Sequence, residues 1–346
     1  MIVMRLCRLD DVDALVELAH KAGPGMTTLK PDHAVQAARL ERVQRTVDGT
    51  APLAEQGYLF VLEDSDSGKV VGVCGLEVAV GLDQPFYTYR MDSFVHASRE
   101  LGLWTKMDKL HMSHGLTGYS ELCTLFLDPD YRVNGNGALL SKARFMFLAQ
   151  FPQRFAEHIC AEMRGHFDEN GESPFWKALG AHFYRIDFHE ADHLVALGKK
   201  SFLAELMPRY PVYIDFLPPE AQACIGKVHK DTEPARRLLE AEGLRLEHHV
   251  DIFEGGPVLE ARIDSLRVMR DSQLCHVEIV PEHAAAGDLR YLVANGELAD
   301  FRVILASANP ADGVIALSAE HAQALHVKSG DTVRAMTLYP AAKAAS

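Results

Sequence analysis

The apolar and polar positions in the first half of the chain follow two periods, that of a strand and that of a helix. The segment MIVMRLCRL alternates as a strand does, and residues 10–23 then repeat apolar positions at helical spacing. An apolar run from Leu122 to Leu127 stops at Asp-Pro and predicts a buried strand, and a long helical pattern follows it. The full predicted order is strand 1–9, helices 10–23 and 34–47, strands 58–64 and 70–81, a strand-like stretch 87–98, a loop 111–120, strand 120–127, helix 136–151 and strand 158–165.

The second half of the chain divides into a helical stretch and a series of short strands. Residues 190–230 are predicted to be mainly helical with proline-containing breaks. From about Leu266 onward, short strands separated by turns predict a small antiparallel sheet or barrel. We therefore expect a first domain at 1–262, with a helical insertion at about 190–230, and a small β-barrel-like domain at 263–346. The other elements predicted here are a short helix 173–180, a strand 183–188, a helix 232–244 and a strand-rich stretch 248–263.

Composition and charge narrow the class of protein. The 346 residues include 48 acidic and 35 basic side chains, for a formal net charge of -13. This balance argues against nucleic acid as the main partner, because phosphate backbones select a basic surface. No stretch approaches the ~18 consecutive apolar residues of a membrane span, and the N-terminus lacks the profile of a signal peptide. The six cysteines stand far apart without a CxxC pair, so we expect free thiols and a cytoplasmic protein with no membrane partner.

The clearest chemical signal is the turn Arg132-Val-Asn134-Gly135-Asn136-Gly137, between the predicted strand and the long helix. The first amides of a helix have no partner within the helix and lie at the positive end of its dipole, so they bind anions. The turn lacks the Gly-Lys-Ser/Thr ending of a P-loop and the G-x-G-x-x-G pattern of a dinucleotide fold. Its spacing resembles the acyl-CoA-binding turn of the GNAT acyltransferases. An ordinary strand-to-helix turn is the alternative.

Longer blocks carry a closer resemblance over nearly the whole chain. SELCTLFLDPDYRVNGNG, AEMRGHFDENGESPFW and IGKVHKDTEPARRLLEAEG resemble the arginine N-succinyltransferases. The resemblance implies an α+β, GNAT-like fold with a mixed, mostly antiparallel sheet flanked by helices. It also implies transfer of succinyl from succinyl-CoA to the α-amine of L-arginine, giving N2-succinylarginine and CoA in the first step of arginine catabolism. No permanently bound cofactor is expected.

Other functions stay open beside this one. Some members of the family accept ornithine, so another amine or another acyl-CoA is an alternative. Two similar subunits occur in some bacteria, so a homo- or hetero-oligomer is expected. The chain would then be either an active enzyme by itself or a partner subunit that works only in a complex.

The same resemblance gives roles to particular residues. It makes His229 the proton donor to the departing thiolate, which suits histidine because its unperturbed pKa lies near neutrality. The alternative is that His229 is an ordinary loop residue before a helix. The resemblance also points to Leu125 as a succinyl-CoA contact, and the pantetheine of CoA is expected to pair with the backbone of this strand as an added strand. The expected donor-binding residues are Leu125, Phe126, Leu127, Arg132, Asn134, Gly135, Asn136 and Gly137.

Several charged residues have more than one interpretation. Glu121, at the start of the strand, is a candidate base or a bidentate partner for the arginine guanidinium, and a solvated strand end is the alternative. Glu162 stands in an apolar run, where an unpaired carboxylate would be costly. The cation for the succinyl carboxylate is not selected by the sequence among Arg90, Lys142 and Arg164.

Two further patterns bear on the site. In the predicted short helix, Trp176 stands where many GNAT enzymes have a proton-donating tyrosine, so the acid must come from elsewhere. His248 and His249 suggest a metal, but neighbouring residues of a strand point to opposite faces, so no metal site is expected. The loop with His111 and His114 is expected near the acceptor.

Overall fold

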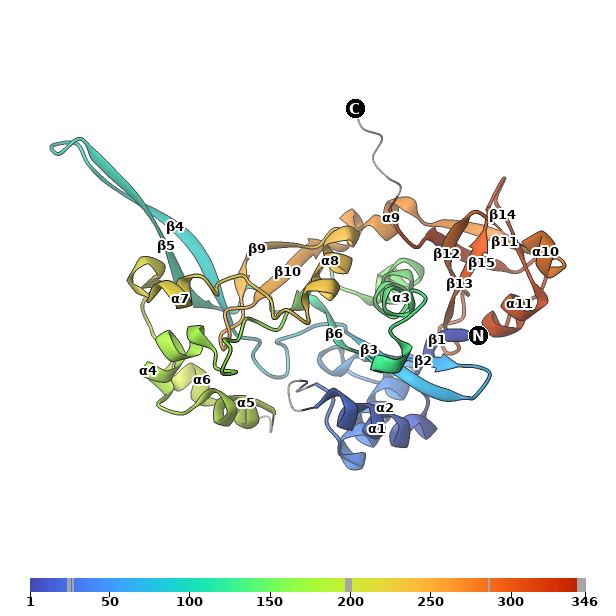
Figure 1. Ribbon diagram of the computed structural model, residues 1–346, viewed down its shortest axis with the longest axis horizontal. Coiled ribbons are helices and arrows are strands. Elements are labelled where there is room, and N and C mark those ends of the chain that lie inside the picture. The colour runs from blue at the N-terminus through green and yellow to red at the C-terminus, as the bar shows by residue number, and fades with distance from the viewer. Residues whose placement is uncertain (24–25, 27, 197–200, 286, 341–346) are drawn as a thin grey trace.

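A computed structural model describes residues 1–23, 26, 28–196, 201–285 and 287–340, and its strands form one 15-stranded sheet along the length of the molecule (Figure 1). Of the described strand pairs, β6–β7 and β11–β14 are parallel and the others are antiparallel. This confirms the predicted α+β class with a mixed, mostly antiparallel sheet. The order across the sheet is β14 (Val314–Leu317), β11 (Gln273–Ile279), β15 (Thr332–Thr337), β12 (Leu289–Ala294), β13 (Arg302–Ala308), β1 (Ile2–Leu6), β2 (Gly57–Asp64), β3 (Lys69–Glu77), β6 (Ser120–Leu127), β7 (His158–Glu162), β10 (Pro257–Arg262), β9 (Arg245–Val250), β4 (Thr88–Ser98), β5 (Leu103–Ser113) and β8 (Val212–Tyr213).

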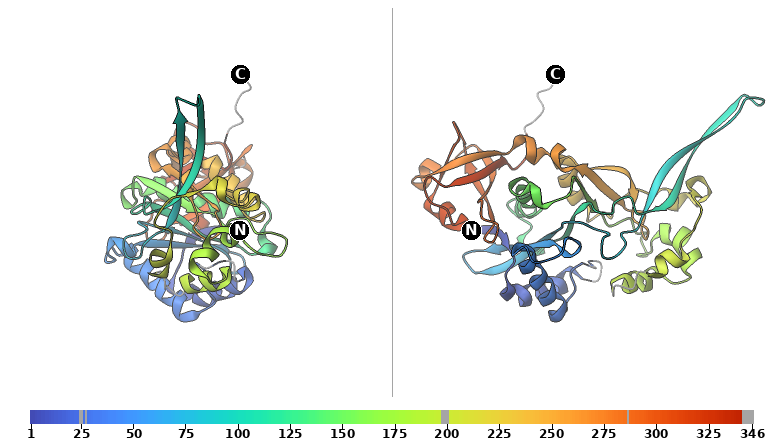
Figure 2. Two further views of the ribbon diagram at one scale, coloured as in Figure 1. Left: turned by 90° about the vertical axis from the view of Figure 1, so that its left-hand side faces the viewer. Right: turned by 180° about the vertical axis from the view of Figure 1, so that it is seen from behind.

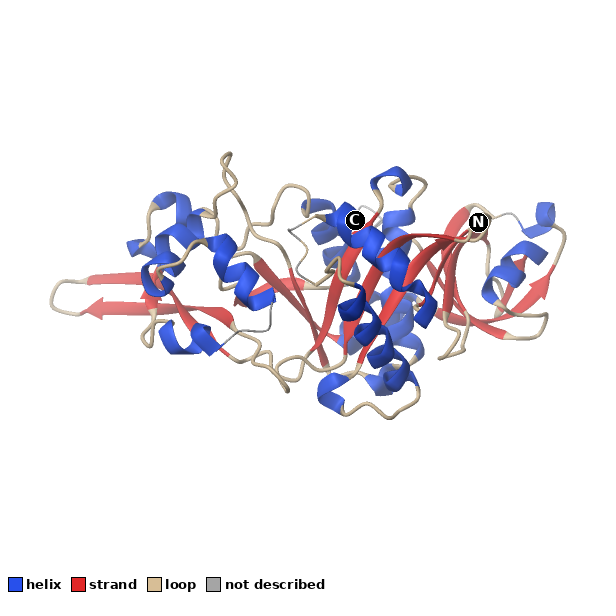
Figure 3. Ribbon diagram, turned by 90° about the horizontal axis from the view of Figure 1, so that it is seen from below, coloured by secondary structure: helices blue, strands red, loops and turns tan. Residues whose placement is uncertain are grey.

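Helices cover both faces of the central strands. Helices α1 (Val12–Ala22) and α2 (His33–Val47) lie below the sheet, and α3 (Asn136–Gln150) lies above it (Figures 1 and 3). Helix α3 is apolar nearly all round and is buried along most of its length, as expected for a core helix. Phe147 of α3 packs edge-on against Phe60 and Phe301, with ring centroids 5.0 and 4.9 Å apart. These contacts join α3 to the sheet.

A separate hydrophobic cluster at one end of the molecule joins the helices at 176–222 to residues of β4, β5 and β9. These helices include a π-helical turn (Trp176–Gly180), α4 (Ala181–Tyr184), α5 (Phe188–Ala196), α6 (Ser201–Leu206) and α7 (Pro219–Gln222). The strand predicted at 183–188 is wrong, because Tyr184 ends a helix and its ring stacks on Trp176 at 5.3 Å. A short aromatic run fits a strand or a buried helix equally well, and packing decides between them.

The helix that leads into the last hairpin of the central sheet is α8 (Glu233–Glu242), which packs against α3. Strand β9 follows α8, and β10 then inserts between β7 and β9. The short helix predicted at 173–180, in which Trp176 was compared with a catalytic tyrosine, lies instead in the hydrophobic cluster at the end of the molecule. The comparison of Trp176 with a catalytic tyrosine therefore fails.

Strands β4 and β5 form a long two-stranded arm that projects away from the body (Figures 1 and 2). The strand predicted at 87–98 is confirmed as β4. The loop predicted at 111–120 is wrong for residues 111–113, which extend β5 and pair with β4. The turn begins only at His114.

The C-terminal part contains α9 (Arg267–Asp271), α10 (Glu282–Ala285), α11 (Ala319–Leu325) and the predicted short strands β11 to β15. It has a hydrophobic cluster of its own, but that cluster includes Val3 of β1. Strand β13 pairs with β1, with Val3 opposite Ile304, so hydrogen bonds join this part to the central sheet. The division at 262/263 stays a prediction.

All six cysteines lie in the described part and are free thiols, as expected. Within that part, no helix has the length and apolar character needed to cross a bilayer.

Candidate active site

The neighbouring strands β6 and β7 separate at the centre of the sheet. They run parallel and pair over two residues, ending with Glu121 opposite Cys160. Strand β6 then continues to Leu127 along β3, with a positive φ of 48° at Thr124. Among the described residues β7 makes no further pair with β6, so the backbone edge of β6 faces an opening. An extended chain can add to such an edge through backbone hydrogen bonds.

The residues expected to bind pantetheine lie along this part of β6. Leu125 is half-buried and its side chain packs against the central core, while Phe126 and Leu127 are buried. Arg132 Nε donates to the Leu127 carbonyl at 3.2 Å, so the end of the edge is bonded within the chain. The side chain of Leu125 thus has a packing role, and its contact with a donor stays a prediction.

The glycine turn leads into the N-terminus of α3. Asn134 and Gly135 have positive φ values of 51° and 82°, a conformation that favours glycine because it carries no Cβ. Asn136 is buried and its Nδ2 donates to the Tyr131 carbonyl at 3.1 Å. No side chain of the described residues caps α3. The Asn136 N–H donates to the Val133 carbonyl at 3.0 Å, so the amides left for an anion are those of Gly137 and Ala138. Arg132 is exposed beside them.

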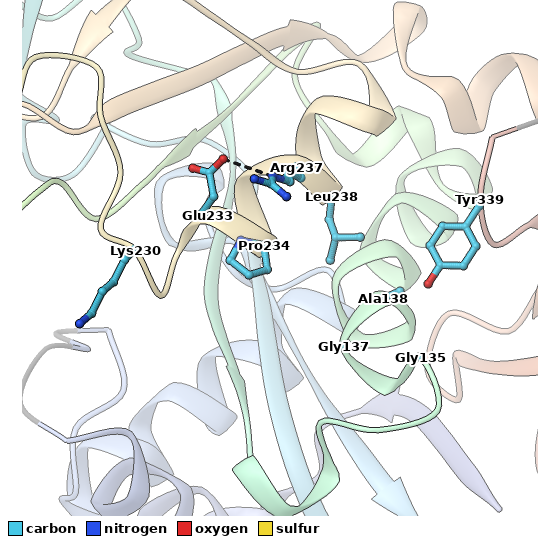
Figure 4. A pocket seen from close by; sticks show the side chains of 9 residues that line it. All are labelled: Gly135, Gly137, Ala138, Lys230, Glu233, Pro234, Arg237, Leu238 and Tyr339. Carbon is cyan, nitrogen blue, oxygen red and sulfur yellow. Dashed lines mark hydrogen bonds and ion pairs between the residues drawn. The ribbon is translucent and has the colours of Figure 1, made fainter. Parts of the chain in front are cut away.

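A surface pocket of about 560 Å³ opens beside the turn, between α3 and the start of α8 (Figure 4). Pockets of this size hold small ligands. Three segments far apart in the sequence meet there, and Arg237 forms an ion pair with Glu233 at 3.3 Å. The lining residues are Gly135, Gly137, Ala138, Lys230, Glu233, Pro234, Arg237, Leu238 and Tyr339.

His229 lies just before α8 and is tied to the chain that continues from β7. Its N–H donates to the Arg164 carbonyl at 2.9 Å, next to a β-bridge between Val228 and Gly165. His229 is therefore bonded to the chain two residues beyond the end of β7.

The environment of His229 defines which ring nitrogen can act. The Asp231 N–H donates to Nδ1 at 3.2 Å, so the neutral ring has its proton on Nε2. The Asp231 carboxylate lies 3.6 Å from Nδ1 and can accept from it when the ring is charged. Nε2 is thus a donor in both states. Partial burial and the charge of Arg164 lower the pKa of His229.

Glu121 belongs to a row of side chains that crosses four strands on one face of the sheet. In the strand registers Glu77 is opposite Glu121, Glu121 is opposite Cys160, and Cys160 is opposite Glu260. Arg42 of α2 holds Glu77 with two hydrogen bonds of 2.7 and 3.0 Å. Burial and the nearby carboxylates raise the pKa of the Cys160 thiol. The row makes this face acidic at the closed end of the gap.

Glu162 and the three cations considered for the succinyl carboxylate differ in burial and in their partners. Glu162 is exposed at the end of β7, so the cost of burying an unpaired carboxylate does not arise. Lys142 is fully buried and its Nζ binds Glu242 at 2.7 Å, which removes it from contact with a substrate. Arg90 pairs with Asp92 on the arm. Of these three cations, Arg164 lies beside His229, whose N–H donates to its carbonyl.

A pair that sequence reasoning missed is His249 with Glu260. His249 Nδ1 lies 2.7 Å from Glu260 Oε1, and the histidine side chain is only 7% exposed. Its Nε2 has no partner within the described residues. His248 is exposed on the opposite face, as the alternation of strand side chains requires. The signal in the sequence was the adjacent histidines, which were considered only as metal ligands, and the described residues contain no group of metal ligands.

An open parallel strand pair, an uncapped helix behind a glycine turn and a closing antiparallel hairpin are the features of the predicted GNAT-like fold. A family model described as arginine N-succinyltransferase beta subunit matches residues 2–268, and the model of its C-terminal domain matches residues 273–337. The chain belongs to the arginine N-succinyltransferase family, as the sequence blocks had indicated.

Individual relatives agree with this assignment over their full length. The chain is 49% identical over 346 residues to the arginine N-succinyltransferase of Enterobacter sp. (strain 638), with 100% of both chains covered. It is 50% identical over 339 residues to that of Escherichia coli (strain 55989 / EAEC), with 98% of each covered. A solved structure of arginine/ornithine succinyltransferase subunit AI from Pseudomonas aeruginosa has a TM-score of 0.88 at 34% identity, covering 98% of this chain and 99% of that one.

Proposed function

We propose that this chain transfers succinyl from succinyl-CoA to the α-amine of L-arginine, giving N2-succinylarginine and CoA. The observation that supports this most is the full-length similarity to proteins named arginine N-succinyltransferase. The carboxylate of Glu121 on this face of the sheet supports a cationic acceptor, because carboxylates pair with guanidinium groups. The reaction would open arginine catabolism by the succinyltransferase route.

The donor side of the proposal follows the open edge of β6. The pantetheine pairs with the backbone of Leu125, Phe126 and Leu127, and the diphosphate lies on the amides of the glycine turn. Arg132, Asn134, Gly135, Asn136 and Gly137 supply that turn. Asn136 shapes the turn rather than binding the anion, because its side chain donates to the Tyr131 carbonyl and its N–H donates to the Val133 carbonyl. No permanently bound cofactor takes part.

The chemical steps need one base and one acid. The neutral amine of arginine attacks the thioester carbonyl, so a C–N bond forms, and the amine proton passes to a base. Glu121 is that base or a partner of the guanidinium. The C–S bond then breaks, and the thiolate takes the Nε2 proton of the charged His229 ring. The lowered pKa of His229 makes its imidazolium a stronger acid for this step.

The test is release of CoA thiol from succinyl-CoA by the purified chain, with arginine, ornithine or no amine. Acetyl-CoA replaces succinyl-CoA as the control, and mass spectrometry identifies the product. We expect fast release only with succinyl-CoA and arginine. Faster turnover of ornithine would favour the ornithine-preferring alternative. CoA binding without release would favour a subunit that is active only with a partner.

We also propose that the chain assembles with a second copy of itself, in the cytoplasm, through the β4–β5 arm. Two-stranded ribbons are marginal in water without further packing. The Pseudomonas aeruginosa neighbour is described as a subunit, which favours assembly here too. The arm exposes an apolar set, including Trp104 at 72%: Phe94, Val95, Leu101, Leu103 and Trp104.

Light scattering of the purified chain tests the assembly. We expect a dimer or larger oligomer, and a monomer for the double variant Leu103→Glu, Trp104→Glu. An exposed leucine away from the arm, Leu53→Glu, is the matched control and should assemble as wild type does. A monomeric wild-type chain would remove the second copy as the partner.

A further inference from the structure

Arg290 of the C-terminal part reaches the glycine turn of the acyltransferase part. It lies on β12, and its Nη2 donates to the Asn134 carbonyl at 2.7 Å although the two residues are 156 positions apart. A Cβ atom built on Gly135 would lie only 2.8 Å from Arg290 Nη1. The guanidinium therefore packs directly on the turn that precedes the open amides of α3. Any anion seated on those amides comes next to a second positive group.

Most of the hydrogen-bonding capacity of Arg290 is directed to solvent. A guanidinium has five N–H donors, and the Asn134 carbonyl takes one of them. In the described part of the chain, Arg290 forms no ion pair with a carboxylate, and its side chain is exposed. This differs from Lys142 and Arg267, which are both buried against Glu242. An exposed arginine without a carboxylate partner suits a phosphate, which it binds through two parallel hydrogen bonds.

Tyr339 lines the pocket at the glycine turn (Figure 4). The Leu338 N–H donates to the Arg290 carbonyl at 2.8 Å, which fixes the position of the tyrosine next to β12. Lys142 Nζ lies 5.2 Å from the centroid of the Tyr339 ring, and Tyr339 as a whole is 56% exposed. An aromatic ring that is held in place but half open to solvent offers a surface on which a base can stack.

We infer that the C-terminal part forms the nucleotide subsite for the acyl-CoA donor, with Arg290 on a phosphate of the CoA nucleotide and Tyr339 against the adenine. The inference rests on the proposed acyl-CoA donor. Pantetheine along β6 and a diphosphate on the amides of α3 leave the phosphoadenosine beyond the turn. Arg290, Tyr339 and the pocket lie at that point. The two parts of the chain would thus share one substrate.

Calorimetric binding of CoA, dephospho-CoA and pantetheine tests the inference without any acceptor. We expect Arg290→Gln to raise the Kd for CoA ~10-fold or more, because hydrogen bonds between charged groups are lost. Pantetheine carries no phosphate, so its Kd should not change. An equal loss for dephospho-CoA assigns Arg290 to the diphosphate, and an effect confined to CoA assigns it to the 3′-phosphate. Arg99→Gln, on the exposed tip of the arm, is the control.

Two further variants keep the inference falsifiable. Tyr339→Leu should raise the Kd for CoA and dephospho-CoA by ~5-fold or more, from lost stacking, and leave 4′-phosphopantetheine unchanged. If Arg290→Gln does not fold, Arg290→Lys replaces it in the test. Lysine keeps the charge, so this variant should keep part of the affinity for CoA. CoA binding as in the wild type, or an equal loss for pantetheine, would overturn the inference. If the wild-type protein binds CoA, the variants lose this binding as expected and no succinyl transfer occurs, only the proposed function is overturned.

Discussion

The N–H of His229 donates to the carbonyl of Arg164 over 2.9 Å, and this bond ties the start of α8 to the chain leaving β7. The two residues are distant in sequence, and Arg164 lies two residues beyond the end of β7. The bond fixes where the imidazole lies, and the Asp231 N–H fixes which nitrogen faces outward. Position and tautomer are thus set by backbone groups.

Replacing His229 with glutamine should lower kcat ~10²–10⁴-fold, because a positioned proton donor contributes that much. The KM for succinyl-CoA should change little, since the side chain acts on the leaving thiolate. Thiol-release kinetics measure both constants. His248→Gln, exposed on β9, is the matched control and should keep wild-type turnover. Turnover of His229→Gln near the wild-type value, with an unchanged thermal transition, would remove His229 from the mechanism.

The pKa of His229 should rise when Arg164 is replaced with glutamine. Burial lowers this pKa first and the Arg164 charge lowers it further, so only the second cause is removed. A proton donor must be charged, so activity falls as pH rises through its pKa, and this fall should move to higher pH in Arg164→Gln. Proton NMR titration, with the His229 signal assigned by its loss in His229→Gln, measures the shift. An unchanged pKa of His229 in Arg164→Gln would mean that the Arg164 charge does not lower it.

Glu121→Gln should separate the two roles considered for this carboxylate. Loss of a base lowers kcat, and the defect should shrink at high pH, where the amine is already neutral. Loss of a guanidinium partner raises the KM for arginine instead and leaves kcat nearly unchanged. Steady-state kinetics from pH 7 to 10 distinguish these patterns. Wild-type constants throughout would exclude Glu121 from the site.

Glu254, in the loop between β9 and β10, should make the protein less stable as pH rises. Burial and the neighbouring Asp251 carboxylate raise the pKa of Glu254 to about 8. The folded state then binds more protons than the unfolded state between the ordinary glutamate pKa of about 4.3 and that value, so stability falls as pH rises through this range. Thermal unfolding between pH 5 and 9 should show this fall, and Glu254→Gln should flatten it. An equally steep fall in the variant would assign the effect to other groups.

Glu242 holds two cations in the interior, Lys142 at 2.7 Å and Arg267 at 3.0 Å. Glu242→Gln should lower the free energy of unfolding by about 3–5 kcal/mol, because it leaves buried charges unpaired. Denaturant unfolding measures the loss. Glu240→Gln, which breaks a more exposed pair with Arg236 on the same helix, should cost less than about 1 kcal/mol. Similar losses of unfolding free energy in the two variants would contradict the larger contribution expected of the buried Glu242 carboxylate.

Local patterns in the sequence were sufficient for much of the central fold. The continuous apolar run of β6 and the apolar helix α3 were predicted within a few residues, because periodicity depends only on neighbouring positions. The aromatic segment at 183–188 was predicted wrongly as a strand. Its rings pack on Trp176 inside a helical cluster, and that contact is not visible in a short pattern.

The sequence by itself determined the family, the order of the central elements and the glycine turn, since each is encoded by adjacent residues. Only the tertiary structure decided that α8 closes the fold, that Lys142 is buried against Glu242, and that Arg290 lies on the turn. It also set Glu121 in a row with Glu77 and Glu260. These relations join residues far apart in the chain, and strand register and helix packing bring them together without a local sequence signal.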